Sequence, residues 1–501
     1  MKAHSYKDKL LNSKNLNREI AVGAVWMTFL RISYRLIGLV STIILARLLT
    51  TDDFGVAAIA MSIFALINTF SQFGFETVLI QKHDADMDDY NTAWTFNFIF
   101  GAFASIFLFC LSPWVGEFYG NVNLEYITKV ISMLFLLHGI RNIGVVDFQK
   151  NLTFDKEFKL HIIPKFISFF ITISLAIYYE NYWALVIGNV AWKTIEVINS
   201  YIMHPFRPSI SFNKSKELFT FSKWLIVNNF LNFTNNKSPE LVLGKLMSPH
   251  AAAIFTLASE LAHMATSEVI SNLNRAIYPG YAKVSHDLPA LRELFKNSIR
   301  VIGFLVMPIG VGVALVSDYI VELVLGLQWL DAVEPLRFLA LGGSIFALKS
   351  NVNYIYFALN KPRISSLELF LRSIIFVGLM MYLIGENGVV GAAQAFFISS
   401  VVMFVVSNVI LTIILNISFT EQIRLYLKPL LAAIIMSVCV KGYLVYLAQG
   451  ILLIDLVLAV IVGVVSYILS VYFIWCLAGC KEGIESQVIK VIRSKFLGKM
   501  S

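Results

Sequence analysis

The amino-acid sequence predicts an all-α, polytopic membrane protein, because the chain is very apolar and its apolar residues come in long runs. Of its 501 residues, 57% are hydrophobic and only 14% are charged, and the mean hydropathy is +0.73. Soluble proteins carry roughly 25% charged residues, which cover their surface. The composition therefore argues against a soluble enzyme, a disordered chain and a nucleic-acid-binding protein.

Apolar runs long enough to cross a bilayer occur fourteen times along the chain. A spanning helix needs about 20 mostly apolar residues. The expected spans are residues 24–49, 54–79, 92–116, 126–147, 162–180, 182–203, 222–247, 250–276, 299–326, 335–359, 364–385, 388–416, 427–448 and 452–477. The connections between them are short, so we expect the function to lie within the membrane.

The positions of the basic residues test this count, because Lys and Arg concentrate in the cytoplasmic loops of membrane proteins. Alternate connections carry them, beginning with the first 20 residues of the chain. The opposite turns, TTDD, GEFYGNVNLE, EN, SPH, GLQWLDAVE, GEN and AQG, contain neither Lys nor Arg. This alternation predicts fourteen spans with both termini in the cytoplasm, and it accounts for much of the net charge of +8.

A weak internal repeat predicts how the spans are grouped. A shift of 198 residues places LARLLTTDDFGVAAIA (45–60) on LGKLMSPHAAAIFTLA (243–258). Repeated helical bundles are a common transporter design. The expected parts are a cytoplasmic tail (1–19), an N-terminal six-helix lobe (20–217), a C-terminal six-helix lobe (218–418), and an accessory helix pair with a basic cytoplasmic tail (419–501).

Several expected spans contain charged residues, which are costly in a bilayer and usually face a cavity or a partner. Arg31 and Arg35 share one face of the first span with Thr28, Gly38 and Thr42, by their spacing of three or four residues. Deep charges elsewhere are also mostly cationic, namely Lys165, Lys237, Arg275, Lys349 and Arg372. A cationic cavity suits an anionic substrate such as a phosphate or diphosphate head group.

The seventh span is rich in asparagine at helical spacing, and the eighth carries a similar polar stripe. A carboxamide group can both donate and accept hydrogen bonds, which suits the hydroxyl groups of a sugar. The residues expected to line a sugar-binding cavity are Asn229, Asn232, Asn236, Glu260 and His263.

A structural role is the alternative for each of these groups. Lys237 with Glu240, and Glu368 with Arg372, have the i,i+3 and i,i+4 spacing of ion pairs within one helix. The asparagines, likewise, would join helices through hydrogen bonds without any contact to substrate.

No motif predicts a metal or cofactor. Asp52 and Asp53 would match the acidic metal ligands of a membrane glycosyltransferase, but their turn is only a few residues long. One of them is better explained as the N-cap of the second span. Histidine and cysteine are too scattered for a metal site, and no glycine loop for phosphates occurs.

The stretch ILARLLTTDDFGVAAIAMSIFALINTFSQFGFETVLIQK (44–82) resembles the opening of the oligosaccharide flippases. These are the Wzx-type polysaccharide exporters of the multidrug/oligosaccharidyl-lipid/polysaccharide superfamily. The similarity lies at residues 45–49, 54–55 and 79–81, and continues in DFQKNLTFDKEFKL (147–160), NYWALVIGNV (181–190) and RPSISFNKSKELFTFSKWL (207–225). Many relatives carry a small acidic residue in the seventh span, where this chain has the asparagines and Lys237, so the coupling ion, H⁺ or Na⁺, stays open.

The resemblance implies a transporter rather than an enzyme. Such flippases move undecaprenyl-diphosphate-linked oligosaccharide units across the bacterial cytoplasmic (inner) membrane by alternating access, for O-antigen, capsule or exopolysaccharide biosynthesis. A polysaccharide polymerase and a chain-length regulator are the expected protein partners. A cation-coupled exporter of small molecules from the same superfamily is the first alternative, although it would more often have twelve spans and an acidic cavity. A membrane polysaccharide polymerase is the second, although it would need a larger outer loop.

Overall fold

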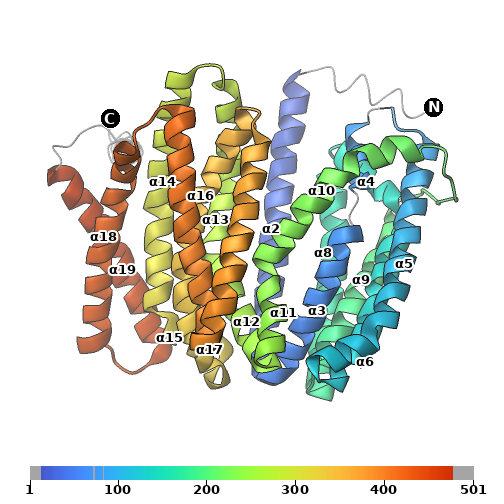
Figure 1. Cartoon of the computed structure of the whole chain (residues 1–501), viewed down its shortest axis with the longest axis horizontal. Helices are drawn as coiled ribbons and strands as arrows, with labels where there is room; N and C mark the ends of the chain where they lie inside the picture. Colours follow the sequence, from blue (N-terminus) through green and yellow to red (C-terminus); the bar gives the residue numbers. More distant parts are fainter. Residues whose placement is uncertain (1–12, 72–73, 83, 478–501) are drawn as a thin grey trace, which may run out of the picture. The chain divides into compact units, whose positions relative to one another are not determined.

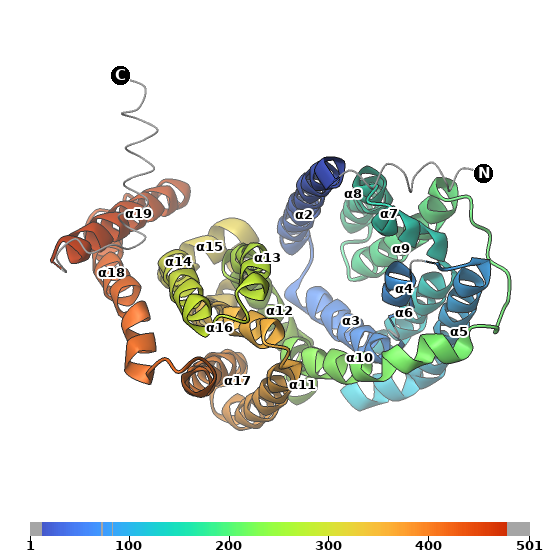
Figure 2. The ribbon, with the colours of Figure 1, turned by 90° about the horizontal axis from the view of Figure 1, so that it is seen from above.

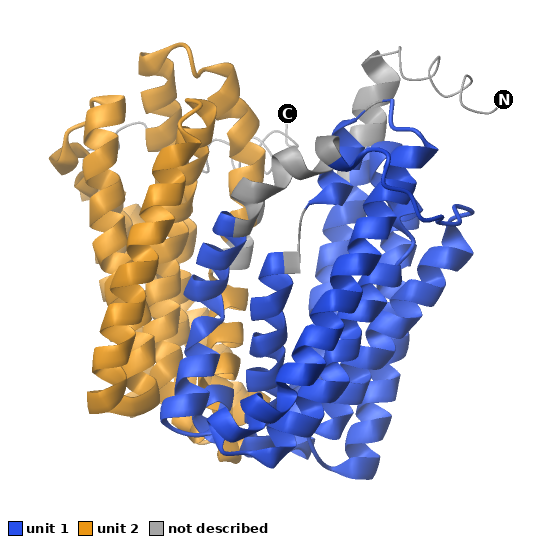
Figure 3. Ribbon diagram, turned by 45° about the vertical axis from the view of Figure 1, so that its right-hand side comes forward, with its two compact units in different colours: residues 1–253 blue, residues 254–501 orange. Residues whose placement is uncertain are grey.

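The computed structural model describes residues 13–71, 74–82 and 84–477, and the regular structure in these ranges is entirely helical (Figure 1). The expected tails before residue 13 and after residue 477 lie outside the described residues. The chain forms two compact units, residues 1–253 and 254–501 (Figure 3), whereas the repeat predicts a lobe boundary at residue 217.

Unit 1 is built from long helices around an apolar core. Its elements are α2 (Ser13–Leu48), α3 (Thr51–Ser71), α4 (Phe75–Gln81), α5 (Met87–Tyr119), α6 (Val122–Ile140), η1 (Ile143–Val146), α7 (Asp147–Lys150), α8 (Phe154–Tyr179), α9 (Trp183–Met203), α10 (Ser215–Asn236), α11 (Ser238–Leu246) and the start of α12 (Pro249–Ala265). Ile59, Leu108 and Phe135 are fully buried between α3, α5 and α6. A Cβ atom on Gly101 would lie 2.6 Å from the carbonyl oxygen of Phe135, so glycine allows the close packing of α5 on α6 (Figure 2).

Unit 2 has a second core of its own. Its elements after α12 are α13 (Ser267–Lys283), α14 (Leu288–Leu315), α15 (Ser317–Ile320), η2 (Val321–Leu325), η3 (Leu327–Ala332), α16 (Val333–Ala358), α17 (Pro362–Leu415), α18 (Phe419–Tyr446) and α19 (Leu452–Leu477). Ile302, Leu348, Tyr356 and Leu411 are buried where α14, α16 and α17 meet. The last two helices, α18 and α19, pack on each other and on α14.

Many of the helices have the length and composition of membrane spans. Within the described residues, eight helices pass this test, or up to nine if the bent pair of α6 and residues 143–150 is one span. Large apolar side chains such as Val464, Ile468 and Leu469 of α19 are exposed, as expected for a surface that faces lipid. Gly388 has non-helical angles (φ 57°, ψ −132°) inside α17, so the expected spans 364–385 and 388–416 meet at this residue.

The expected seventh and eighth spans are each formed by two helices rather than one. The seventh is interrupted at Lys237 (φ −126°, ψ −13°), between α10 and α11. Pro239 explains this break, because proline lacks an N–H donor and its ring disfavours helical continuation before it. The eighth is interrupted at Thr266, and α13 continues to Lys283, beyond the expected end at residue 276.

The turn before α3 differs from the prediction in its capping residue. The backbone N–H of Asp53 donates to Thr50 Oγ1 at 3.2 Å, and the N–H of Thr50 donates to Asp53 Oδ2 at 3.2 Å. Thr50 is therefore the N-cap, and the prediction that Asp52 or Asp53 fills this position is wrong. Asp53 is the third residue of the helix and completes a capping box.

Candidate functional site

The bent fourth span places a half-buried arginine, Arg141, in unit 1, with 14% of its side chain exposed. α6 ends at Ile140, and residues 143–150 continue at an angle of 66° to it. Asn142 stabilises the bend, because its Oδ1 accepts from the N–H of Gly144 and its Nδ2 donates to the carbonyl of Phe206, both at 2.9 Å. Arg141 lies at the bend itself, so its guanidinium group has a defined position.

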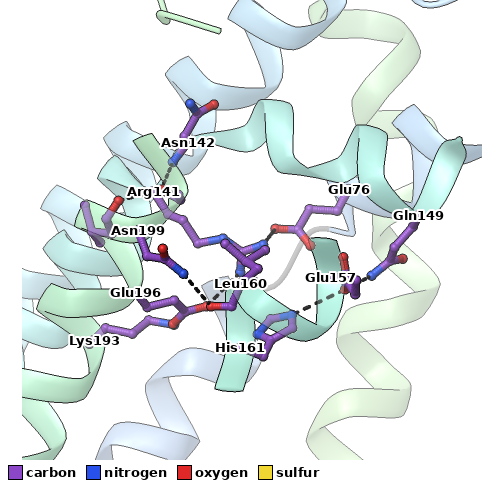
Figure 4. A network of polar contacts seen from close by, with 12 residues as sticks. Glu76, Arg141, Asn142, Gln149, Glu157, Leu160, His161, Lys193, Glu196 and Asn199 are labelled. Atoms are coloured by element: carbon purple, nitrogen blue, oxygen red, sulfur yellow. Dashed lines mark hydrogen bonds and ion pairs between the residues drawn. The ribbon is translucent and has the colours of Figure 1, made fainter. Parts of the chain in front are cut away.

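The Arg141 guanidinium group contacts glutamates from two other helices (Figure 4). Its Nη1 lies 3.2 Å from Glu196 Oε1 on α9, and its Nη2 lies 3.5 Å from Glu76 Oε1 on α4. Lys193 Nζ lies 2.7 Å from the second oxygen of Glu196. A buried carboxylate is tolerated when it has such partners, and the Glu196 side chain is only 4% exposed.

A second carboxylate, Glu157 in the first turn of α8, lies in the same region (Figure 4). Gln149 Nε2 on α7 donates to Glu157 Oε1 at 2.6 Å, and His161 Nε2 lies 3.3 Å from the same oxygen. Arg141 is close enough to Glu157 to act on it electrostatically. The Arg141 network, defined as Glu76, Arg141, Gln149, Glu157, His161, Lys193 and Glu196, thus connects α4, α7, α8 and α9 at the bend after α6.

Aromatic rings and cations lie together on α2, α8 and α9. Lys165 Nζ is 4.9 Å from the ring centroid of Tyr34 and 5.4 Å from that of Trp192, which are cation–π distances. The predicted site residues Arg31 and Arg35 lie on the same helix as Tyr34, and both are half-buried. Positive charge is therefore held at this place by side chains of separate helices.

The predicted asparagine face is accessible along α10. Asn229 is half-buried, and Asn232 and Asn236 are exposed. Asn232 and Asn236 each donate to the carbonyl four residues earlier, at 2.9 and 2.8 Å. Asn235, which the same run contains, is instead buried.

Lys237 lies at the junction of α10 and α11. Its Nζ is 2.9 Å from Glu240 Oε1, which confirms the i,i+3 ion pair considered from the sequence. The Lys237 side chain is 47% exposed, whereas that of Glu240 is 3% exposed. The lysine therefore still reaches solvent while it neutralises a buried carboxylate.

In unit 2 the predicted pairing of Glu368 with Arg372 is wrong. Glu368 Oε2 lies 2.7 Å from Lys349 Nζ on α16, and the hydroxyls of Tyr356 and Ser407 donate to its Oε1 at 2.7 and 2.9 Å. Helical spacing places Arg372 near Glu368, but the packing of α16 against α17 supplies a different cation.

The Arg372 side chain packs between aromatic rings. Its guanidinium carbon lies 4.2 Å from the ring centroid of Phe346 and 5.2 Å from that of Phe396. The residue is 3% exposed, and its Nε and Nη2 atoms make no hydrogen bond. Unit 2 therefore buries one cation that has its carboxylate and a second that is held by rings.

The remaining predicted residues also belong to unit 2. Glu260 and His263 of α12 are half-buried, and Arg275 of α13 is exposed. The His263 ring meets the ring of Phe396 edge-on, with centroids 6.0 Å apart. The asparagines of α10 belong to unit 1, so their proximity to Glu260 and His263 stays a prediction.

Sequence reasoning missed most of the Arg141 network. Lys193 and Glu196 have the i,i+3 spacing of a helical ion pair, and Glu157 and His161 have the i,i+4 spacing, so a search for such pairs would have found them. Arg141 has no comparable local signal, because its partners are 55 and 65 residues away in the chain.

The fold of the chain is similar to that of a solved membrane protein. It is similar to the structure titled "Lipid II flippase MurJ, inward closed conformation", with a TM-score of 0.72 and 14% identity over 91% of this chain and 99% of that chain. The chain therefore has the same all-α fold as that structure.

Sequence comparison then identifies the family. A family described as "Polysaccharide biosynthesis protein" matches residues 44–334. The lipopolysaccharide biosynthesis protein WzxC of Escherichia coli (strain K12) is 24% identical over 77% of this chain and 80% of its own length. The teichuronic acid biosynthesis protein TuaB of Bacillus subtilis (strain 168) is 22% identical over 85% and 89%. The chain belongs to this family of Wzx-like polysaccharide flippases, so it is a multi-pass membrane transporter and not an enzyme, and the resemblance stated from the sequence is confirmed.

Proposed function

We propose that this protein translocates undecaprenyl-diphosphate-linked oligosaccharide repeat units across the bacterial cytoplasmic membrane for the biosynthesis of a surface polysaccharide. The observation that carries the proposal is the family match over residues 44–334. The cations held within each unit support it, because a lipid diphosphate brings negative charge into the membrane protein. The names of WzxC and TuaB support a polysaccharide precursor as the substrate class.

The proposal includes fourteen spans with both termini in the cytoplasm. The eight helices that pass the test for spans include α17, which holds two helices that meet at Gly388. The bent pair α6–α7, the single helices α9 and α16, and the interrupted helices α10–α11 and α12–α13 supply the others. Single cysteines at Asn181 and Asn387 should react with an impermeant thiol reagent in intact cells, and cysteines in 150–160 and 207–216 should not. Reversed labelling contradicts this topology.

Transport would proceed by alternating access between the repeated lobes 20–217 and 218–418, with 419–501 as an accessory part. One contact within unit 1 supports the repeat. A Cβ atom on Gly55 would lie 1.8 Å from the carbonyl oxygen of Pro249, and Thr51 Oγ1 lies 2.7 Å from His250 Nδ1. The shift of 198 residues makes the starts of α3 and α12 equivalent, and equivalent elements meet at the axis of such a repeat.

The diphosphate would bind to cations that the substrate can reach. Arg31 and Arg35 are half-buried, and Lys237 and Arg275 are exposed, so these four are accessible in the present conformation. Lys349 and Arg372 are buried and would meet a diphosphate only after α16 and α17 separate locally.

The sugar would bind to the carboxamides of α10 together with Glu260 and His263. Cysteines that replace Asn232 and Asn236 should react with a small water-soluble thiol reagent, at a rate that substrate changes. A cysteine at the buried Asn235 is the matched control on the same helix and should react slowly. Equal, slow reaction at all three positions would assign the asparagines to helix packing.

Deletion of the gene tests the function itself. Lipid-linked repeat units should accumulate inside the cell and the surface polysaccharide should be lost, and the wild-type gene should restore it. Arg31→Gln and Arg35→Gln should each impair export at near-normal protein levels, because each removes one positive charge from the first span. Lys129→Gln, in a half-buried ion pair with Glu125 outside the first span, should have no effect. An unchanged surface polysaccharide in the deletion strain would refute the proposed function.

A further inference from the structure

The buried glutamates of the described residues differ in the partner that neutralises them. Four glutamates are buried: Glu157, Glu196, Glu240 and Glu368. Three of them pair with Lys or Arg: Glu196 with Lys193 and Arg141, Glu240 with Lys237, and Glu368 with Lys349. Glu157 pairs with His161 instead.

Because of this difference, only one of the four carboxylates has a partner whose charge changes near neutral pH. Lysine and arginine side chains stay protonated near neutral pH, whereas an imidazole changes its charge between about pH 5 and 8. The pair of Glu157 and His161 therefore exists with a net charge of about −1, or as a neutral pair that holds one more proton. The other three carboxylates keep their positive partner throughout this range.

The geometry gives a proton a route to this pair. The His161 side chain is 30% exposed, so water reaches the imidazole, whereas the Glu157 side chain is 5% exposed. Gln149 Nε2, 2.6 Å from Glu157 Oε1, holds the carboxylate in place from α7. An accessible imidazole on a shielded, oriented carboxylate is an arrangement that proton relays of membrane proteins use, and here it lies at the start of α8, at the cytoplasmic end of the proposed span.

The pair lies among several other charged groups. Arg141 acts on Glu157, and Glu196 on α9 interacts with His161. Lys193 on α9, Glu76 on α4 and His138 on α6 interact in turn with Arg141 or Glu196. The Arg141 network, with Glu157 included, holds three carboxylates and the two permanent cations Arg141 and Lys193. One proton on the pair balances these charges, and charge balance matters greatly where the dielectric constant is low.

We propose that Glu157 and His161 form a proton-binding site that couples transport to the proton gradient across the membrane; this rests on the proposed flippase function. When the pair loses its proton, the carboxylate attracts Arg141 more strongly, because Arg141 is a permanent cation that acts on it. Arg141 lies at the 66° bend after α6. The protonation state of the pair therefore acts on the bend and on the helices that Arg141 joins, α4 and α9.

Proton binding is measured first, on the full-length protein in detergent micelles with ¹⁵N-labelled histidine. The signal of the His161 imidazole is assigned as the one that is absent from the spectrum of His161→Gln. In the wild type this signal should titrate between pH 5 and 8. In Glu157→Gln its titration should be displaced. Glu125→Gln removes a glutamate with the same i,i+4 spacing to its partner at a site outside the Arg141 network, and should leave the titration unchanged. A His161 signal that does not titrate in this range, or that ignores Glu157→Gln, overturns the proposal. His161→Asn is the second variant if His161→Gln does not fold.

Coupling is measured in proteoliposomes that contain a pH dye and a polyprenyl-diphosphate-linked sugar labelled on the sugar with a dithionite-sensitive fluorophore. An imposed proton gradient should accelerate translocation in the wild type by about tenfold, within the usual range of coupling between sites, and protons should move with the probe. His161→Gln and Glu157→Gln should lose this acceleration, and Glu125→Gln should keep it. A gradient response that persists in His161→Gln, or that follows Na⁺ instead, overturns the coupling site. A wild type that moves no probe refutes the flippase function, and the titration still decides the proton site.

Discussion

Unit 1 and unit 2 both bury charged side chains, but they surround them differently. In unit 2, the ion pair of Lys349 and Glu368 is shielded from solvent, at 6% and 2% exposure. In unit 1, the Arg141 network includes members that reach solvent, with Glu76 at 44% and His161 at 30% exposure. The first is a single pair that joins α16 to α17, and the second is spread over several helices.

The difference shows how one membrane protein uses buried charge in two ways. In an ion pair that is shielded from solvent, each charge depends wholly on the other, since neither water nor a third group can replace a lost charge. A wetter network with several members tolerates the loss of one contact and can change its proton content. We therefore expect substitutions in unit 2 to act on stability, and those in unit 1 to act more on the pH response.

The largest expected effect is that of Glu368→Gln. This variant leaves Lys349 buried without a carboxylate, and breaking a buried pair in this way costs about 3–5 kcal/mol. Thermal or denaturant unfolding of the purified protein in detergent measures the loss. Glu125→Gln, from a pair whose side chains are 31% and 26% exposed, is the control and should cost much less. If the free energy of unfolding falls as little as it does in the control, the ion pair in unit 2 is not shielded from solvent.

A smaller loss is expected for Glu196→Gln in the Arg141 network. Arg141 keeps Glu76 as a partner, and the Lys193 side chain is 16% exposed, so the cost should be about 1–3 kcal/mol. The same unfolding measurement serves here. A cost that equals that of Glu368→Gln would remove the distinction between the two units.

Arg372→Leu should change stability by less than about 1 kcal/mol, because apolar replacement of a buried charged group is often neutral or stabilising. The Nε and Nη2 atoms of Arg372 make no hydrogen bond, and leucine retains apolar contact with Phe346 and Phe396. If Arg372 binds the diphosphate as proposed, export should nevertheless fall. Loss of stability together with export would assign the arginine to packing alone.

The smallest effect is expected outside the membrane, at Asp86, the N-cap of α5. The backbone N–H of Asp89 donates to Asp86 Oδ1 at 2.9 Å and lowers the pKa of this carboxyl below its usual value. Because the folded-state pKa is lowered, the stabilisation is present above the ordinary pKa and is lost as the pH falls through the lowered one. Asp86→Asn should therefore reduce the acid dependence of unfolding slightly and leave stability at neutral pH nearly unchanged. An unaltered profile between pH 5 and 2 would contradict this, as measured by unfolding at each pH.

The sequence by itself determined the class of this protein and much of its helix layout. Apolar runs and the alternation of basic loops depend on local composition, so they identify helices such as α5, α14 and α19 without any knowledge of packing. The ion pair of Lys237 and Glu240 was predictable for the same reason, since helical spacing alone brings the two side chains together.

Tertiary structure decided which helices contribute to each charged group. Glu368 has Arg372 one turn away along its own helix, yet it pairs with Lys349, because the packing of α16 on α17 brings that lysine 2.7 Å away. Arg141 likewise obtains Glu76 and Glu196 only because the bend after α6 directs it between α4 and α9. Local spacing sets which residues share a helix face, but the facing helix supplies the partner, and burial makes that partner necessary.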